Sequence, residues 1–116
     1  MITINIKDFS KEAATETKGK FLKGLLETPL IENNEISVDF NEITRFASPF
    51  FNNSFSALAL KYGFDKIEHI HLINLSEVGQ LAYKTSIDNA KFLSENPKYS
   101  ETINNIINTN LPKKDI

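Results

Sequence analysis

The hydrophobic residues of this chain change their spacing repeatedly along its length, and this alternation constrains the fold more than any other feature. In residues 2–6 and 36–40 every second residue is hydrophobic, which is typical of a strand with one buried face. In the segments between and after them, hydrophobic residues recur every three or four positions, the spacing of an amphipathic helix. Strands that alternate with helices predict an α/β fold, and right-handed crossovers make neighbouring strands parallel.

We predict strands over residues 2–6, 35–40 and 67–75. Three strands are few for a stable sheet, so we expect a fourth, either in the segment before Phe21 or between Phe40 and Phe46. The expected architecture is therefore a mostly parallel sheet of about four strands with helices packed on it.

Helix boundaries follow from capping residues and from proline. A short helix carrying Phe21 to Leu26 should end before Pro29, because proline cannot continue a helix interior. A second helix is expected over 49–62, ended by Gly63, and a third from Ser76 to about Ser94. The third helix should face inward with Val78, Leu81, Ala82, Thr85, Asn89 and either Phe92 or Leu93.

The chain has 116 residues, the size of one domain. We assign residues 1–96 to a compact α/β domain and residues 97–116 to a C-terminal helical extension. The extension carries a stripe of Ile103, Ile106, Ile107 and Leu111. This stripe could cover the sheet, pair two subunits into a homodimer or dock on a partner, and the sequence does not choose among these.

Composition excludes several function classes. With 13 basic and 15 acidic residues the formal charge is −2, which disfavours broad nucleic-acid binding. The chain has no cysteine, so thiol catalysis and thiolate metal sites are absent and a reducing cytoplasm is expected. No stretch is as long and apolar as a membrane span.

No motif specifies an active site, a cofactor or a metal. The sequence lacks the G-x-S-x-G elbow, the G-x-G-x-x-G fingerprint and the Walker A loop. His69 and His71 would share one face of the predicted strand, but no third ligand lies near them, so a structural role is favoured over zinc. Asp39 and Glu42 could form a carboxylate pair, although an Asp that orders the turn after its strand is the more ordinary reading.

The pair Ser48-Pro49 indicates a helix start, with Ser48 as the N-cap. A hydroxyl at that position could also accept a phosphoryl group, since the helix N-terminus favours a phosphate. Asn52, Asn53 and Ser54 should lie on the polar side of the first turns. We expect these four residues to form a small uncharged surface for a protein partner.

Residues 36–50, Ile-Ser-Val-Asp-Phe-Asn-Glu-Ile-Thr-Arg-Phe-Ala-Ser-Pro-Phe, resemble the core of the STAS superfamily of sulphate transporters and anti-sigma-factor antagonists. More closely, they resemble the bacterial STAS-like domains of unknown function. There, a strand ending in Val-Asp-Phe precedes a short turn, a Ser-rich helix start, a Phe and a polar pair. The resemblance extends from Lys20, with a Gly-x-x-Phe-like element at 19–22, to the strand at 67–74.

This resemblance implies a small α/β sandwich with a mixed sheet that has no catalytic activity and takes part in protein interactions. In anti-sigma-factor antagonists a partner kinase phosphorylates the second Ser of an Asp-Ser-Ser-Gly run. Position by position, that run falls on Ala47, Ser48, Pro49 and Phe50. The phosphoacceptor is thus replaced by proline, which leaves Ser48 as the nearest hydroxyl.

Three functional hypotheses follow. The first is a non-enzymatic interaction domain that docks, through helix 49–62 and the loop before it, on a partner such as an ATPase of the histidine-kinase type. The second is a module that binds a small molecule or nucleotide at the same helix N-terminus. A nucleic-acid-associated regulator is the third and least favoured.

Overall fold

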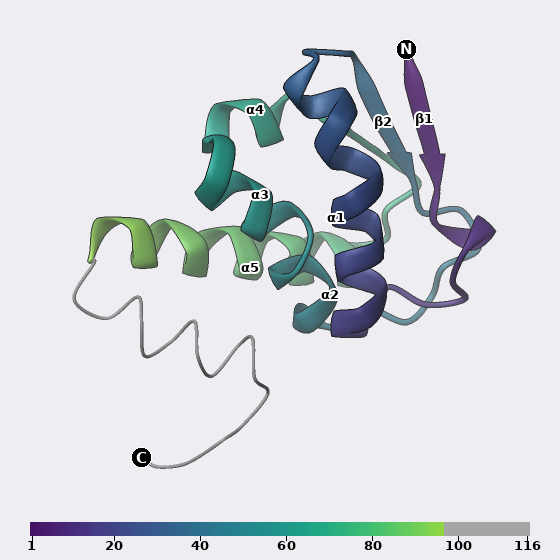
Figure 1. Ribbon diagram of the computed structural model, residues 1–116. Coiled ribbons are helices and arrows are strands. Elements are labelled where there is room, and N and C mark those ends of the chain that lie inside the picture. The colour runs from purple at the N-terminus through teal and green to yellow at the C-terminus, as the bar shows by residue number, and fades with distance from the viewer. Residues whose placement is uncertain (97–116) are drawn as a thin grey trace.

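The computed structural model describes residues 1–96, and within them a three-stranded parallel sheet is covered on one face by helices (Figure 1). The strands β1 (Ile2–Asn5), β2 (Ile36–Asp39) and β3 (His71–Ile73) lie in the order β1-β2-β3. The register places Ile4 beside Val38 and Val38 beside Leu72. The α/β class is therefore confirmed.

The expected count of about four strands, in a mixed sheet, needs correction. The two segments in which a fourth strand was expected do meet, but only through an isolated parallel bridge between Ala13 and Phe46. Neither segment carries the alternating hydrophobic residues that would fix a longer register. In the described part of the chain the sheet therefore has three strands, all parallel.

Within residues 1–96, six helical segments connect and follow the strands. They are η1 (Ile6–Asp8), α1 (Glu16–Ile31), α2 (Ser48–Asn52), α3 (Phe55–Tyr62), α4 (Phe64–Glu68) and α5 (Glu77–Glu95). The two long helices have side-chain caps, because Thr15 accepts from the Lys18 N–H and Ser76 from the Gly79 N–H. Gly63 ends α3 with a φ of 109°, as its position predicts.

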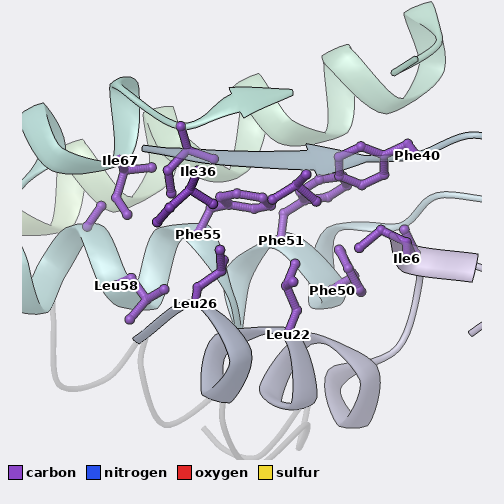
Figure 2. Packing of buried hydrophobic residues seen from close by; sticks show 14 of the residues in the cluster. Ile6, Leu22, Leu26, Ile36, Phe40, Phe50, Phe51, Phe55, Leu58 and Ile67 are labelled. Carbon is purple, nitrogen blue, oxygen red and sulfur yellow. The ribbon is translucent and has the colours of Figure 1, made fainter. Parts of the chain in front are cut away.

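The core lies between α1 and the sheet and is built around phenylalanines. Figure 2 shows Leu22 and Leu26 of α1 pointing toward the aromatic rings, which in turn lie against Ile36 of β2. Phe40, Phe50, Phe51 and Phe55 are fully buried. Phe51 contacts Phe50 edge to face, with the ring centroids 5.2 Å apart, a geometry that the quadrupoles of the rings favour.

The prediction that the first helix ends before Pro29 is wrong, because α1 continues through this residue to Ile31. Proline lacks the N–H that would bond the carbonyl of Leu25. Leu25 is 40% exposed, so water can reach that turn. One turn later Leu30 is buried in the core, and this packing holds the last turn in place.

Most of the strand predicted over 67–75 is not a strand. Residues 64–68 form α4, His69 caps that helix, and β3 holds only His71–Ile73. Ile67 and Ile70 are both buried and lie three positions apart. This spacing fits a helical turn, although the β-branched side chains also fit a strand. His69 and His71 consequently do not share a strand face.

Of the residues predicted to face inward from the helix after Ser76, Leu93 is buried and Ala82 packs against the core, but the others do not. Val78 and Leu81 are 63% and 67% exposed, and Thr85 and Asn89 also face outward. Instead α5 buries Gly79, Ser86, Ile87, Ala90 and Leu93. The prediction relied on hydropathy, which does not identify Ser86, a small polar residue, or Gly79, which has no side chain, as buried.

The predicted C-terminal extension, with its stripe of Ile103, Ile106, Ile107 and Leu111, lies outside the described residues. None of the helices within residues 1–96 combines the length and the hydrophobicity that a membrane span requires.

Candidate functional site

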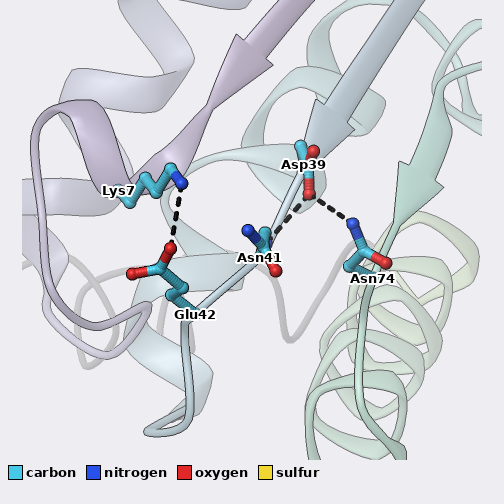
Figure 3. Close-up of polar contacts among 5 residues, drawn as sticks. All are labelled: Lys7, Asp39, Asn41, Glu42 and Asn74. Atoms are coloured by element: carbon cyan, nitrogen blue, oxygen red, sulfur yellow. Dashed lines mark hydrogen bonds and ion pairs between the residues drawn. The ribbon is translucent and has the colours of Figure 1, made fainter.

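Residues 40–48, which comprise the loop between β2 and α2 and the first residue of α2, lie at the end of the sheet where the parallel strands end, and we call them the docking loop. Two other segments meet it there, one that follows β1 and one that follows β3, because parallel strands end on the same side of the sheet. Figure 3 shows the resulting contacts: Lys7 follows β1, Asp39 ends β2 and Asn74 follows β3. The sequence reasoning singled out Asp39 but missed Lys7 and Asn74.

Asp39 joins two of these segments with one carboxylate oxygen. Its Oδ1 accepts from the Asn41 N–H at 2.9 Å and from Asn74 Nδ2 at 2.9 Å. The Asn74 amide, which has the larger effect, and the Asn41 N–H lower the pKa of Asp39 because they stabilise the ionised carboxylate. The predicted ordinary role, an Asp that orders the turn after its strand, matches this geometry.

Glu42 does not pair with Asp39 but with Lys7. Lys7 Nζ lies 3.0 Å from Glu42 Oε2, and this hydrogen bond, with the charge of Glu42, raises the pKa of Lys7. The turn itself is closed by a hydrogen bond from the Ile43 N–H to the Phe40 carbonyl, 3.0 Å long. Glu42 has a φ of 69° in this turn, a conformation that glycine or asparagine adopts at less cost.

The second half of the docking loop is held in place by backbone hydrogen bonds and by packing. The Ala13 N–H donates to the Arg45 carbonyl and the Ala47 N–H donates to the Ala13 carbonyl, at 3.0 and 3.1 Å. Phe46 packs against Gly79, where an added Cβ would lie 2.8 Å from the Phe46 ring. The loop is therefore held from both sides, which lowers the entropy that it would lose on binding.

Ser48 is not the N-cap that the sequence predicted. It is the first residue of α2, Ala47 occupies the cap position, and no side chain caps the helix. The helix has five residues, Pro49 lacks an N–H, and the Phe50 N–H donates to Ala47. Few N–H groups are left in that turn for an anion, so the geometry offers little to the small-molecule or nucleotide hypothesis.

The predicted helix over 49–62 is divided into α2 and α3 at Asn53 and Ser54, and these two residues face inward. Asn53 is 5% exposed and donates to the Pro49 carbonyl, while Ser54 is fully buried and donates to the Phe50 carbonyl. Such bonds to carbonyls four residues back satisfy both side chains internally. The prediction that Asn53 and Ser54 form an accessible polar surface is therefore corrected.

Asn52 is half-buried and belongs to a polar chain that connects three helices. Ser86 of α5 donates to Asn52 Oδ1 at 2.6 Å, and Ser86 Oγ lies 2.6 Å from Ser56 Oγ of α3. Ser56 and Ser86 are 4% and 1% exposed. Of the four predicted contact residues, the structure thus leaves Ser48 and part of Asn52 near the surface.

His69 and His71 lie at the opposite end of the sheet, where β3 begins. They line an open hollow of about 710 Å³ together with Glu35 and Asp65. His69 Nδ1 lies 2.6 Å from the Asp65 carbonyl oxygen, whereas His71 Nε2 lies 3.8 Å from Glu35. Within residues 1–96 no group of three or more His, Cys, Asp or Glu side chains could hold a metal ion.

Comparison with known proteins gives one match. Residues 18–80 match the model of the family described as the STAS-like domain of unknown function (DUF4325). The chain belongs to this family. No curated protein and no solved structure matches the chain. The resemblance inferred from residues 36–50 is therefore confirmed.

The match covers the part of the STAS-like domain that carries the docking loop. It begins in the first turn of α1 and ends in the first turn of α5. β1 lies outside the matched region, yet it pairs with β2 along four residues. Most of α5 also lies outside, although Tyr83 packs edge to face on Phe55 at 5.4 Å. Both elements therefore belong to the same folded unit.

Proposed function

We propose that this STAS-like domain is a non-enzymatic protein-interaction module and that it binds its partner through the docking loop, residues 40–48. The observation that carries the proposal is a loop whose backbone is held by its neighbours while four of its side chains are exposed. Asn41, Glu42, Thr44 and Arg45 are exposed, and Ile43 is buried as their anchor.

Two further features support a protein partner. The exposed side chains include an acidic, a basic and several uncharged groups, a mixture that is common at the rim of non-obligate interfaces. Small-molecule sites are concave, whereas Asn41, Glu42, Thr44 and Arg45 of this loop are exposed. Because the backbone is already ordered, binding would cost little loop entropy.

The family resemblance makes an ATPase of the histidine-kinase type the first partner to test. In this chain Pro49 stands where the anti-sigma-factor antagonists have their phosphoacceptor. We therefore propose that binding depends on the shape and charge of the docking loop. Phosphorylation of Ser48, the hydroxyl next to that position, would add negative charge at the start of α2 and change that surface.

A quantitative pull-down from the native host tests the proposal. Thr44→Arg places a long cation in the middle of the docking loop, and Ser48→Asp adds a negative charge at its end. Thr28→Arg makes the same change at an exposed position of α1 and serves as the control. We expect wild type and Thr28→Arg to capture the same protein at least tenfold above background, and Thr44→Arg to lose it. Identical partner lists for all four proteins would contradict the proposal.

A further inference from the structure

Both ends of the docking loop are attached to one short segment, residues 74–79, which runs from the end of β3 into the first turn of α5. Asn74, its first residue, donates to the Asp39 carboxylate directly before the loop. Gly79, its last residue, lies against the Phe46 ring near the other end of the loop. We call residues 74–79 the backing segment. The shape of the docking loop depends on where this segment lies.

Phe46 is the aromatic side chain that anchors the second half of the docking loop. Its ring centroid lies 6.2 Å from that of Phe40 and 6.4 Å from that of Phe51. The half-buried ring thus extends the aromatic core to the surface of the molecule. Thr44 and Arg45, which precede Phe46, are exposed, so the position of the ring sets where these two side chains project.

Gly79 leaves the space that the Phe46 ring occupies. A Cβ at this position would lie 2.8 Å from Cε1 and 3.0 Å from Cζ of that ring, and 2.4 Å from Leu75 Cδ1. Because these atoms lie at the ends of side chains, an added methyl group would displace them rather than the backbone of α5. Phe46 belongs to the docking loop, so its displacement would move the loop.

The glycine serves packing and not backbone conformation. Its φ is not positive, so another residue could adopt the same backbone, and glycine weakens a helix relative to alanine. Gly79 is also buried, so a partner at the docking loop would not touch it. What the fold requires at this position is therefore a missing side chain beside Phe46.

We propose that Gly79 is a positioning residue for the docking loop. By leaving room for the Phe46 ring it fixes where Thr44 and Arg45 lie, and partner binding depends on it without direct contact. The family match, residues 18–80, includes both the docking loop and the backing segment. The link to partner binding rests on the proposed function, whereas the effect of Gly79 on the loop does not.

Nuclear Overhauser spectra of the full-length wild type give the first test, which needs no variant to fold. We expect cross-peaks between the ring protons of Phe46 and the Hα protons of Gly79, because the ring lies where a Cβ would be. Absence of these cross-peaks would overturn the proposal.

Amide chemical shifts of Gly79→Ala give the second test. We expect residues 40–48 to shift more than α1, and to shift about threefold less when Phe46→Leu has removed the ring atoms that meet the new methyl group. Gly24→Ala makes the same change where a Cβ meets nothing within 4 Å and should leave the loop unshifted. The proposal is wrong if Gly79→Ala leaves residues 40–48 in place or shifts them equally with and without the Phe46 ring.

The pull-down from the native host measures the effect on binding. Gly79→Ala should capture the partner about tenfold less than the wild type, because a displaced loop must be reordered on binding. Gly24→Ala should capture it as the wild type does. Equal capture by Gly79→Ala and the wild type would refute the positioning role and leave the proposed function intact. A wild type that captures nothing would refute the proposed function and its link to Gly79, and the chemical shifts would still decide whether Gly79 positions the loop.

Discussion

Asp39 shows how a single carboxylate can set the shape of a surface loop. It accepts hydrogen bonds from a backbone N–H in its own loop and from the Asn74 side chain after β3. Asn74 has a φ of 59°, a conformation that asparagine tolerates better than most residues. The docking loop and the loop after β3 therefore hold one another in place.

Asp39→Asn should lower the free energy of unfolding by about 1 kcal/mol at neutral pH, since hydrogen bonds to a charged group are replaced by weaker ones at a partly exposed site. The folded state lowers the pKa of Asp39. The contribution of the carboxylate is thus complete above its unfolded pKa and is lost as the pH falls through the lower folded value. Urea unfolding of both proteins from pH 7 to pH 2.5 should show the difference shrinking below about pH 4. A difference that grows on acidification would be inconsistent with this role.

Ser86 occupies the middle of the buried chain that joins Asn52, Ser86 and Ser56. Ser86→Ala removes the shared hydroxyl and leaves two partly or fully buried polar groups without their partner, which should cost about 1 to 3 kcal/mol. Ser94→Ala at an exposed position of the same helix is the control and should stay within about 0.5 kcal/mol. Chemical denaturation measures the free energy of unfolding of both variants. Equal effects would mean that the hydrogen bonds among Asn52, Ser86 and Ser56 add no stability.

Element boundaries depend on contacts that local sequence patterns do not contain. The alternation in residues 2–6 and 36–40 predicted two strands, and both are present. Pro29 was expected to end α1, but tertiary packing of Leu30 outweighs its local cost. The split of helix 49–62 depends on the side chains of Asn53 and Ser54 bonding to their own helix, and hydropathy does not reveal such bonds.

Two glycines of α1, Gly19 and Gly24, allow the effect of helix propensity on stability to be distinguished from the effect of packing. An added Cβ at Gly19 would lie 2.4 Å from the Phe50 carbonyl oxygen of α2, whereas at Gly24 it would meet nothing within 4 Å. Gly19→Ala should therefore destabilise the protein by about 1 to 3 kcal/mol through overpacking. Gly24→Ala should stabilise it by about 0.5 to 1 kcal/mol, because alanine favours the helix. Urea midpoints of the two variants should move in opposite directions, and a shift in the same direction would refute the close contact of α1 with α2.

At the scale of the whole molecule, the sequence predicted the fold class and the family, but it expected on the surface two site residues that are buried. Val-Asp-Phe and the Ser48-Pro49 pair lie within the residues that match the family model. Asn53 and Ser54 were expected on the surface because they are polar, yet their hydrogen bonds are satisfied inside the protein. The general rule that parallel strands end at one edge could have brought Lys7 and Asn74 to the site.

Site-specific photo-crosslinking in the native host tests the docking loop most directly. A photoreactive amino acid at position 44 reports on what touches the loop, and the same group at position 28 reports on an exposed face of α1. Our account predicts a discrete protein adduct from position 44 that is absent from position 28. It would be contradicted if position 44 gave no adduct or if both positions gave the same one.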